Sequence, residues 1–207
     1  MKPFFATLAP CLMLLGSATS FAASTVDLTV TGLIVPSACT PSLSDGGHID
    51  HGKISAKDLN PDRFTQVGSH DMTLTVTCDG TTVIAIHAID NRAGSSSIPA
   101  EAFGLGFAND NQPLGHYFLG AYDAVADGAP MQTIISADGG DTWTETGRWY
   151  PGRYVSAASP DTPLQPAPLK ELTAKLAMTT WIEPTDSLDL SDDIPIDGSA
   201  TLEVKYL

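Results

Sequence analysis

Residues 71–90 read DMTLTVTCDGTTVIAIHAID. Over residues 71–78 apolar side chains alternate with threonines, which is the period of a strand with one buried face. The run 82–89 is β-branched and apolar on both faces, as in a strand that lies between two others. Asp79 and Gly80 form a typical turn pair between the two runs. This stretch predicts two strands joined by a turn, and with them a β fold.

Further strands are predicted from alternation and turn residues, over residues 26–34, 103–107, 117–121, 133–136, 142–145, 172–182 and 198–207. Leu169, Leu172 and Leu176 would also suit one face of a helix, but the β-branched and aromatic residues that follow favour a strand. The 103–107 and 133–136 strands are each expected to form a hairpin with the next strand. Residues 147–168 hold five prolines and are expected to run as a surface connection. The whole pattern predicts an all-β protein with a β-sandwich architecture.

The N-terminus predicts export. Lys2, the apolar run 4–15 and the small residues up to Ala22 follow the order of a secretory signal peptide. A bilayer span needs about 20 apolar residues, so we expect cleavage after Ala22 and no membrane insertion afterwards. The expected domains are a signal peptide over 1–22 and one domain over 23–207, whose first residues, about 23–31, form an arm.

The exported chain is acidic. Loss of the signal peptide leaves 185 of the 207 residues, with nine Lys and Arg against 24 Asp and Glu. A chain of this length is expected to form a single domain. Its negative charge repels nucleic acid and anionic membranes, so neither is expected as a partner.

Two cysteines, Cys39 and Cys78, remain after signal cleavage. An exported protein meets an oxidising compartment, so we expect them to form a disulfide. The alternative is metal binding, for which two cysteines without CxxC spacing give little support.

Both ends of the exported chain are predicted strands. The last strand, 198–207, has no successor to cover its edge, and an uncovered edge is a template for another chain. One subunit's arm could therefore complete the sheet of the next subunit, and such a head-to-tail contact builds a filament. The alternative is that the arm pairs with its own sheet in a closed sandwich.

Several residues resemble the chaperone-usher pilins. Gly32 stands seven positions before Cys39, Cys78 closes an alternating strand, and Tyr206 is the penultimate residue of the chain. More narrowly, five stretches together resemble a proteobacterial family of unknown function whose members are similar to fimbrial proteins. These stretches are residues 46–54, 74–78, 90–95, 103–106 and 197–204.

The resemblance implies an immunoglobulin-like sandwich that lacks its final strand and is completed by a donor strand. It implies a subunit of a cell-surface fimbria that serves cell adhesion. A periplasmic pilus chaperone, an outer-membrane usher and neighbouring fimbrial subunits would be its partners. The implied donor-strand arm carries Val26, Leu28, Val30 and Gly32. The implied groove and chaperone-contact strand carries Ala200, Leu202, Val204 and Tyr206.

A second possibility is a monomeric or tip-located secreted module that binds a glycan. Four aromatic residues fall within twelve positions and could stack on sugars, namely Trp143, Trp149, Tyr150 and Tyr154. Packing in a core or hairpin explains them equally well.

Other motifs give little support for chemistry. Residues 136–143, SADGGDTW, resemble the Asp-box of sialidases, which is a folding device of a hairpin turn. His48, Asp50 and His51 are metal-binding types crowded into a glycine-rich loop, and the acidic run 186–193 lacks the spacing of a calcium loop. Without a nucleophile elbow, the sequence predicts no enzyme, no metal site and no cofactor.

Overall fold

The computed structural model describes residues 29–31, 38–109, 111–160 and 164–207. The chain divides into two units, Met1–Ile34 and Val35–Leu207, and the strands of the described residues all belong to the second unit. Among the described residues, no helix is long and apolar enough to cross a membrane.

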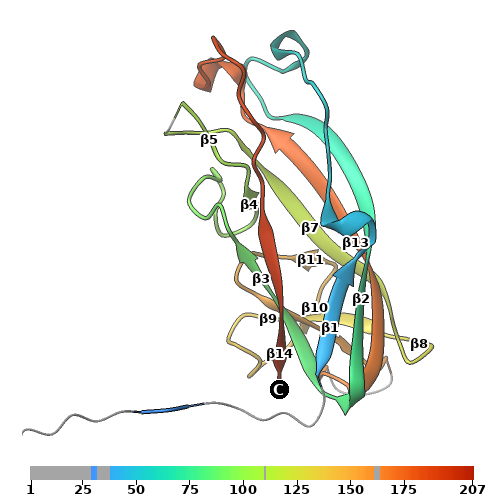
Figure 1. Ribbon diagram of the computed structural model, residues 1–207. Helices are drawn as coiled ribbons and strands as arrows, with labels where there is room; N and C mark the ends of the chain where they lie inside the picture. Colours follow the sequence, from blue (N-terminus) through green and yellow to red (C-terminus); the bar gives the residue numbers. More distant parts are fainter. Residues whose placement is uncertain (1–28, 32–37, 110, 161–163) are drawn as a thin grey trace, which may run out of the picture. The chain divides into compact units, whose positions relative to one another are not determined.

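The described chain is all-β, as predicted, and its helical elements are three short 3-10 turns. Its strands are β1 (Cys39–Leu43), β2 (Thr65–Thr82), β3 (Ile84–Asp90), β4 (Phe103–Gly104), β5 (Phe107–Ala108), β6 (Gln112–Pro113), β7 (Gly115–Ala126), β8 (Ala129–Pro130), β9 (Gln132–Ser136), β10 (Thr144–Glu145), β11 (Arg148–Trp149), β12 (Tyr154–Ala158), β13 (Leu169–Ile182) and β14 (Ala200–Tyr206). One sheet has the order β1-β2-β13-β7-β11, and the other has the order β10-β9-β12-β3-β14 (Figure 1). The two sheets make the predicted immunoglobulin-like sandwich.

Strand β2 confirms the alternation over residues 71–78. Leu74, Val76 and Cys78 are at most 2% exposed, whereas Thr73 and Thr77 face solvent. The buried side chains of β2 pack with those of β3, β7 and β13 in one core between the sheets. This core follows from the sequence pattern, since each strand puts every second side chain on the same face.

The predicted turn at Asp79 and Gly80 is wrong. Both residues continue β2, which extends to Thr82, and the Asp79 amide donates to the Ala38 carbonyl at 2.9 Å. Strands β2 and β3 lie in different sheets, so the chain crosses from one sheet to the other after Thr82 instead of forming a hairpin.

The prediction of a surface connection over 147–168 is also wrong in part. Strand β12 lies within that range and is an interior strand between β9 and β3. It is buried through small side chains, and Ser156 satisfies its hydroxyl by donating to the Ile84 carbonyl at 2.6 Å. A buried strand of small residues shows no apolar alternation. The prolines around it were therefore the strongest signal in this stretch, and they indicate a loop.

Most of the remaining strand predictions agree with the structure. The strand predicted over residues 26–34 lies largely outside the described residues, and the described residues 29–31 are not in a strand. Strand β13 spans the stretch that also suited a helix, and β9 pairs with β10 as a hairpin. The 103–107 strand is broken into β4, which pairs antiparallel with β7, and β5, which pairs with β6.

The predicted disulfide joins β1 to β2. Cys39 and Cys78 are directly opposite each other in the antiparallel pair, and their sulfurs are 2.08 Å apart. The bond therefore fixes the beginning of β1, which is the edge strand of its sheet, to an interior strand.

Candidate functional site

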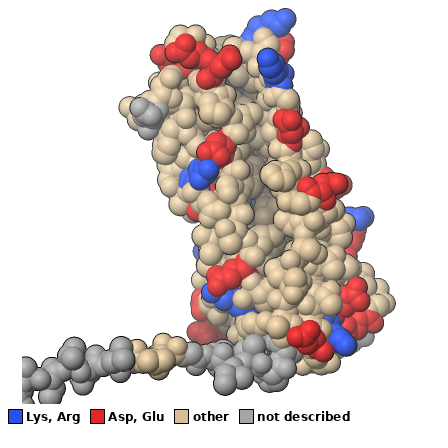
Figure 2. All heavy atoms as spheres, viewed as in Figure 1, with Lys and Arg blue, Asp and Glu red and all other residues tan. Residues whose placement is uncertain are grey.

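Two adjoining cavities form one groove along the sandwich. Their volumes are about 730 and 310 Å³, and Ile49, His51 and Ile196 line both of them. One wall runs from the end of β1 at Leu43 to Leu59, and the other wall runs from Leu190 into β14 as far as Leu202. In Figure 2 this hollow runs lengthwise between two ridges of mostly uncharged surface.

The floor of the groove is the hydrophobic core itself. Leu105, Leu119 and Leu176 line the smaller cavity and are at most 7% exposed. Above them, partly exposed apolar side chains form the sides, namely Leu43, Met72, Met178, Ile196, Ala200 and Leu202. Burial of apolar surface contributes about 25 cal/mol per Å², so an apolar segment that covered this opening would be stabilised there.

Strand β14 forms one edge of the groove, and among the described strands it pairs with β3 alone. The Asn91 amide donates to the Ser199 carbonyl at 3.0 Å, and the Leu207 amide donates to the Val83 carbonyl at 3.1 Å. These bonds fix the alternation of the antiparallel ladder, in which odd-numbered residues of β14 bond to β3. The even-numbered residues therefore direct their backbone N–H and C=O groups to the open edge. They are Ala200, Leu202, Val204 and Tyr206, the residues that the resemblance to pilins implies for the groove strand.

Strand β1, an edge strand of the opposite sheet, lies beside β14 near the disulfide (Figure 1). The Cys39 amide donates to the Tyr206 hydroxyl at 2.8 Å, which joins the two edges there. This contact gives Tyr206, which is 36% exposed, a structural partner within the chain.

The wall segment 48–54 is anchored through His51. Its Nε2 lies 3.0 Å from the Oγ1 of Thr180 on β13, and its ring meets that of His70 on β2 edge to face at 5.1 Å. Gly68 lies beneath both rings, because a Cβ there would be 2.8 Å from His51. Burial lowers the pKa of His51, and the nearby His70 lowers it further, while Asp50 opposes the shift.

We predict that acid loosens this wall. The pKa of His51 is lowered in the folded protein, so the stability that neutral His51 contributes is present above its ordinary value of 6.5 and is lost as the pH falls through the lowered value. The melting temperature should fall over that pH range, and His51→Gln should reduce the fall. His116, whose pKa is also lowered by burial, accounts for a remaining part.

His48→Gln is the matched control, since His48 is exposed on the same segment. An equal reduction of the pH dependence in both variants would contradict the assignment to His51.

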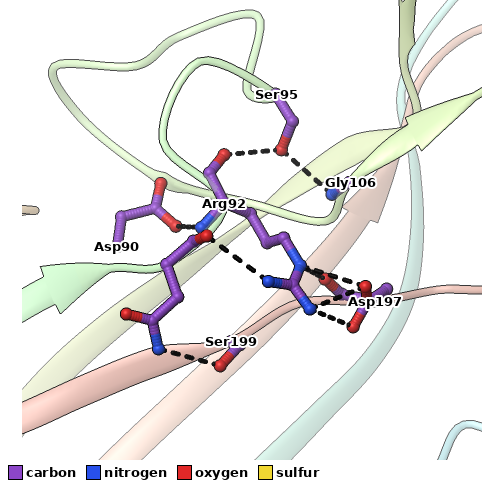
Figure 3. Close-up of polar contacts among 7 residues, drawn as sticks. Asp90, Arg92, Ser95, Gly106, Asp197 and Ser199 are labelled. Carbon is purple, nitrogen blue, oxygen red and sulfur yellow. Dashed lines mark hydrogen bonds and ion pairs between the residues drawn. The ribbon is translucent and has the colours of Figure 1, made fainter. Parts of the chain in front are cut away.

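The segment that leads into β14 is held by an ion pair between Arg92 and Asp197 (Figure 3). The Arg92 Nη2 lies 2.8 and 2.7 Å from the two carboxylate oxygens of Asp197, and Nε lies 3.0 Å from Oδ2 and 2.9 Å from the Asp197 carbonyl oxygen. This hydrogen bonding lowers the pKa of the Asp197 carboxyl. The guanidinium thus holds both the side chain and the backbone of Asp197.

The backbone around Arg92 is fixed by two other residues of loop 90–95, Asp90 and Ser95. The Asp90 carboxylate accepts the Arg92 amide at 2.8 Å and the Gly104 amide at 3.0 Å. Ser95 donates its hydroxyl to the Arg92 carbonyl at 2.8 Å and accepts the Gly106 amide at 3.0 Å. Only glycine fits at 104, because a Cβ there would lie 2.1 Å from the Ser95 hydroxyl oxygen. Through these hydrogen bonds and the ion pair, loop 90–95 bridges residues 104–106 and the segment just before β14.

The implied arm lies mostly outside the described residues. Val26, Leu28 and Gly32 fall there, and of the residues named for the arm only Val30 is described, with 86% of its surface exposed.

The aromatic residues considered for glycan contact have separate structural roles. Trp149 is fully buried and donates its Nε1 to the Arg153 carbonyl at 3.1 Å, so it cannot stack on a sugar at the surface. Trp143 lies in the β9–β10 turn, where its Nε1 donates to the Gly140 carbonyl at 2.9 Å. Tyr150 and Tyr154 are partly exposed, the former packed against the core.

The Asp-box-like residues 136–143 form a hairpin turn. Asp138 accepts the Thr142 amide at 3.0 Å and the Ser136 hydroxyl at 2.7 Å, and Gly140 donates its amide to the Ser136 hydroxyl at 2.8 Å. Hydrogen bonding to Thr142 is the main cause of the strongly lowered pKa of the Asp138 carboxyl. The motif is a folding device, as the sequence indicated.

The histidine and aspartate residues singled out in the sequence are separated in the structure, since His48 lines the smaller cavity while Asp186 and Asp189 line neither. Asp50, Asp192 and Asp193 line the larger cavity together with His51 and Lys53. Within the described part of the chain, no three His, Cys, Asp or Glu side chains come close enough together to hold a metal ion.

Sequence reasoning missed the pairing of Arg92 with Asp197. Both residues lie in stretches singled out by the family resemblance, 90–95 and 197–204, but 105 positions separate them. The sequence offered one indication of this pairing. Each residue lies in a polar stretch next to a predicted strand, and neither stretch had another assigned role.

Comparison with known proteins gives relatives over nearly the whole chain. The family described as "Protein of unknown function (DUF1120)" matches residues 28–98. The uncharacterized protein YhcF of Escherichia coli K12 is 27% identical over 237 residues, which cover 95% of this chain and 98% of that protein. Protein GltF of the same organism is 28% identical over 225 residues, which cover 87% of this chain and 88% of GltF. The resemblance to a family of unknown function is thus supported over a region that contains three of its five stretches.

Proposed function

We propose that the protein is a structural subunit of a cell-surface fimbria, in which the groove takes up the N-terminal arm of a neighbouring subunit. The observation that carries this proposal is a hydrophobic core open along a groove beside the unpaired edge of β14. An extended segment added there would pair its backbone with the even-numbered residues of β14 and bury alternate side chains on the core. Cell adhesion is the role that such a fibre would serve.

The arm suits the groove in pattern and matches β14 in length. Residues 24–30 and β14 each comprise seven residues, and a strand rises about 3.3 Å per residue, so both would extend over roughly 23 Å. Ala200 and Leu202 are the residues of β14 that line the groove, and β1 lies beside the other end of the strand. Val26, Leu28 and Val30 alternate with polar residues, as a strand needs if one face is to be buried.

The proposal includes assembly partners. A bare groove would aggregate during export, so a periplasmic chaperone that lends a strand would protect it, and an outer-membrane usher would receive the complex. The resemblance to chaperone-usher pilins supports this route. The role is structural and not catalytic.

Sedimentation of the purified exported chain, residues 23–207, tests the proposal. Chains with an intact arm should associate as their concentration rises, whereas chains that lack residues 23–31 should remain monomers. Leu28→Asp should prevent association, because docking would bury its charge.

Thr29→Asp is the matched control, since residue 29 would face away from the groove and should leave association nearly unchanged. Association of the arm-deleted chain to the same extent as the intact chain would contradict the proposal.

A further inference from the structure

The wall of the groove before β14 has little regular structure of its own. Residues 188–199 form no strand, and strand pairing starts at Ala200. Ile196 in this segment lines both cavities, and Gly198 lines the smaller one. The position of the segment therefore determines the shape of the groove at the point where its two parts meet.

Three contacts hold this segment on the floor of the groove. The Asp197 amide donates to the Leu105 carbonyl at 3.0 Å. Gly198 packs closely, because a Cβ there would lie 2.9 Å from Leu105 and 3.2 Å from Tyr117. The guanidinium of Arg92 donates hydrogen bonds to the carboxylate and to the backbone carbonyl of Asp197.

The next residues are held by the neighbour of Arg92. The side-chain Nδ2 of Asn91 donates to the hydroxyls of Ser199 and Thr201, each at 3.0 Å. The backbone N–H of Asn91 donates to the Ser199 carbonyl. Loop 90–95 thus fixes the chain from Asp197 into the beginning of the β14 ladder.

We propose that Arg92 and Asp197 are positioning residues for strand docking, which hold the 196–199 wall in the conformation that receives the incoming strand. This inference rests on the proposed function. Neither side chain lines the groove, so the pair acts through Ile196, Gly198 and Ala200 and not by touching the strand.

The physical basis is preorganisation of the groove. A wall that is already ordered loses no conformational entropy when the strand binds, whereas a loosened wall must be ordered at that moment. Ordering the backbone of one residue costs as much free energy as about a tenfold loss of affinity. A guanidinium suits this task because its planar fork bonds both carboxylate oxygens, and lysine cannot reproduce that geometry.

The test measures binding of a fluorescently labelled peptide of residues 23–31 to the exported chain and its variants. Arg92→Lys and Asp197→Asn should each weaken binding by about tenfold or more. The double variant should weaken binding no further than the single variants do, because both substitutions break the same contact.

Arg148→Lys is the matched control. Arg148 also pairs with a carboxylate, that of Glu101 at 3.9 Å, but it does not line the groove. Its peptide affinity should equal that of the unaltered chain.

The midpoints of unfolding show whether the Arg92–Asp197 pair acts on peptide binding or only stabilises the fold. The inference holds if Arg92→Lys loses peptide affinity while its unfolding midpoint stays close to that of Arg148→Lys. Unchanged affinity in Arg92→Lys, with or without a lower midpoint, would overturn it. If the unaltered chain does not bind the peptide, the proposed function fails and not this inference alone.

Discussion

Replacement of both Cys39 and Cys78 by alanine is expected to lower the free energy of unfolding by about 4 kcal/mol. The disulfide closes a loop of 39 residues, and the estimate follows from the chain entropy that this closure removes from the unfolded state. Because a domain of this size is stabilised by only about 5 to 15 kcal/mol, the bond supplies a large part of the total.

Guanidinium unfolding of the exported chain, with and without reductant, measures this contribution. Reduction should bring the midpoint of the unaltered chain down to that of the double variant, and the variant should not respond to reductant. The melting temperature should fall by roughly 10 °C. An unchanged midpoint on reduction would show that β1 is held in place by its hydrogen bonds alone.

Leu202→Asp is expected to weaken binding of the 23–31 peptide by at least about a hundredfold. Leu202 lies on the side of the groove, partly exposed, with its backbone groups at the open edge. In the free protein a carboxylate there remains hydrated, so the fold should tolerate the change. A docked strand would bury the charge without a partner, which costs several kcal/mol.

Thr73→Asp is the control, because it adds the same charge on the solvent-facing side of β2, where the side chain lines neither cavity of the groove. Fluorescence anisotropy with the labelled peptide should give an affinity close to that of the unaltered chain for this control. Equal losses in the two variants would assign the effect to net charge and would contradict the burial of Leu202 beneath a docked strand.

The sequence was sufficient to predict the strands that carry a one-sided apolar pattern. In β2, β13 and β14 the alternation is long, and the structure confirms it. Burial of alternate side chains is a local property of the sequence, so it can be deduced without knowledge of the fold.

Features that depend on distant parts of the chain could not be deduced in this way. The Asp79-Gly80 pair is a turn signal only where the flanking strands share a sheet, and here they do not. Strand β12 is buried by β9 and β3, which are distant from it in the sequence, so its small residues gave no signal of their own. The pairing of Arg92 with Asp197 likewise requires β3 and β14 to be adjacent.

The melting temperature of the domain without residues 23–31 tests strand exchange most directly. The deletion removes none of the core residues of the described chain, which all follow residue 38, so the domain should fold. At about 100 times its dissociation constant, a synthetic 23–31 peptide should add about 2.7 kcal/mol of stability. The melting temperature should then rise by roughly 5 to 10 °C, and a scrambled peptide should have no effect. A stable domain whose melting temperature does not respond to the peptide would contradict assembly through this arm.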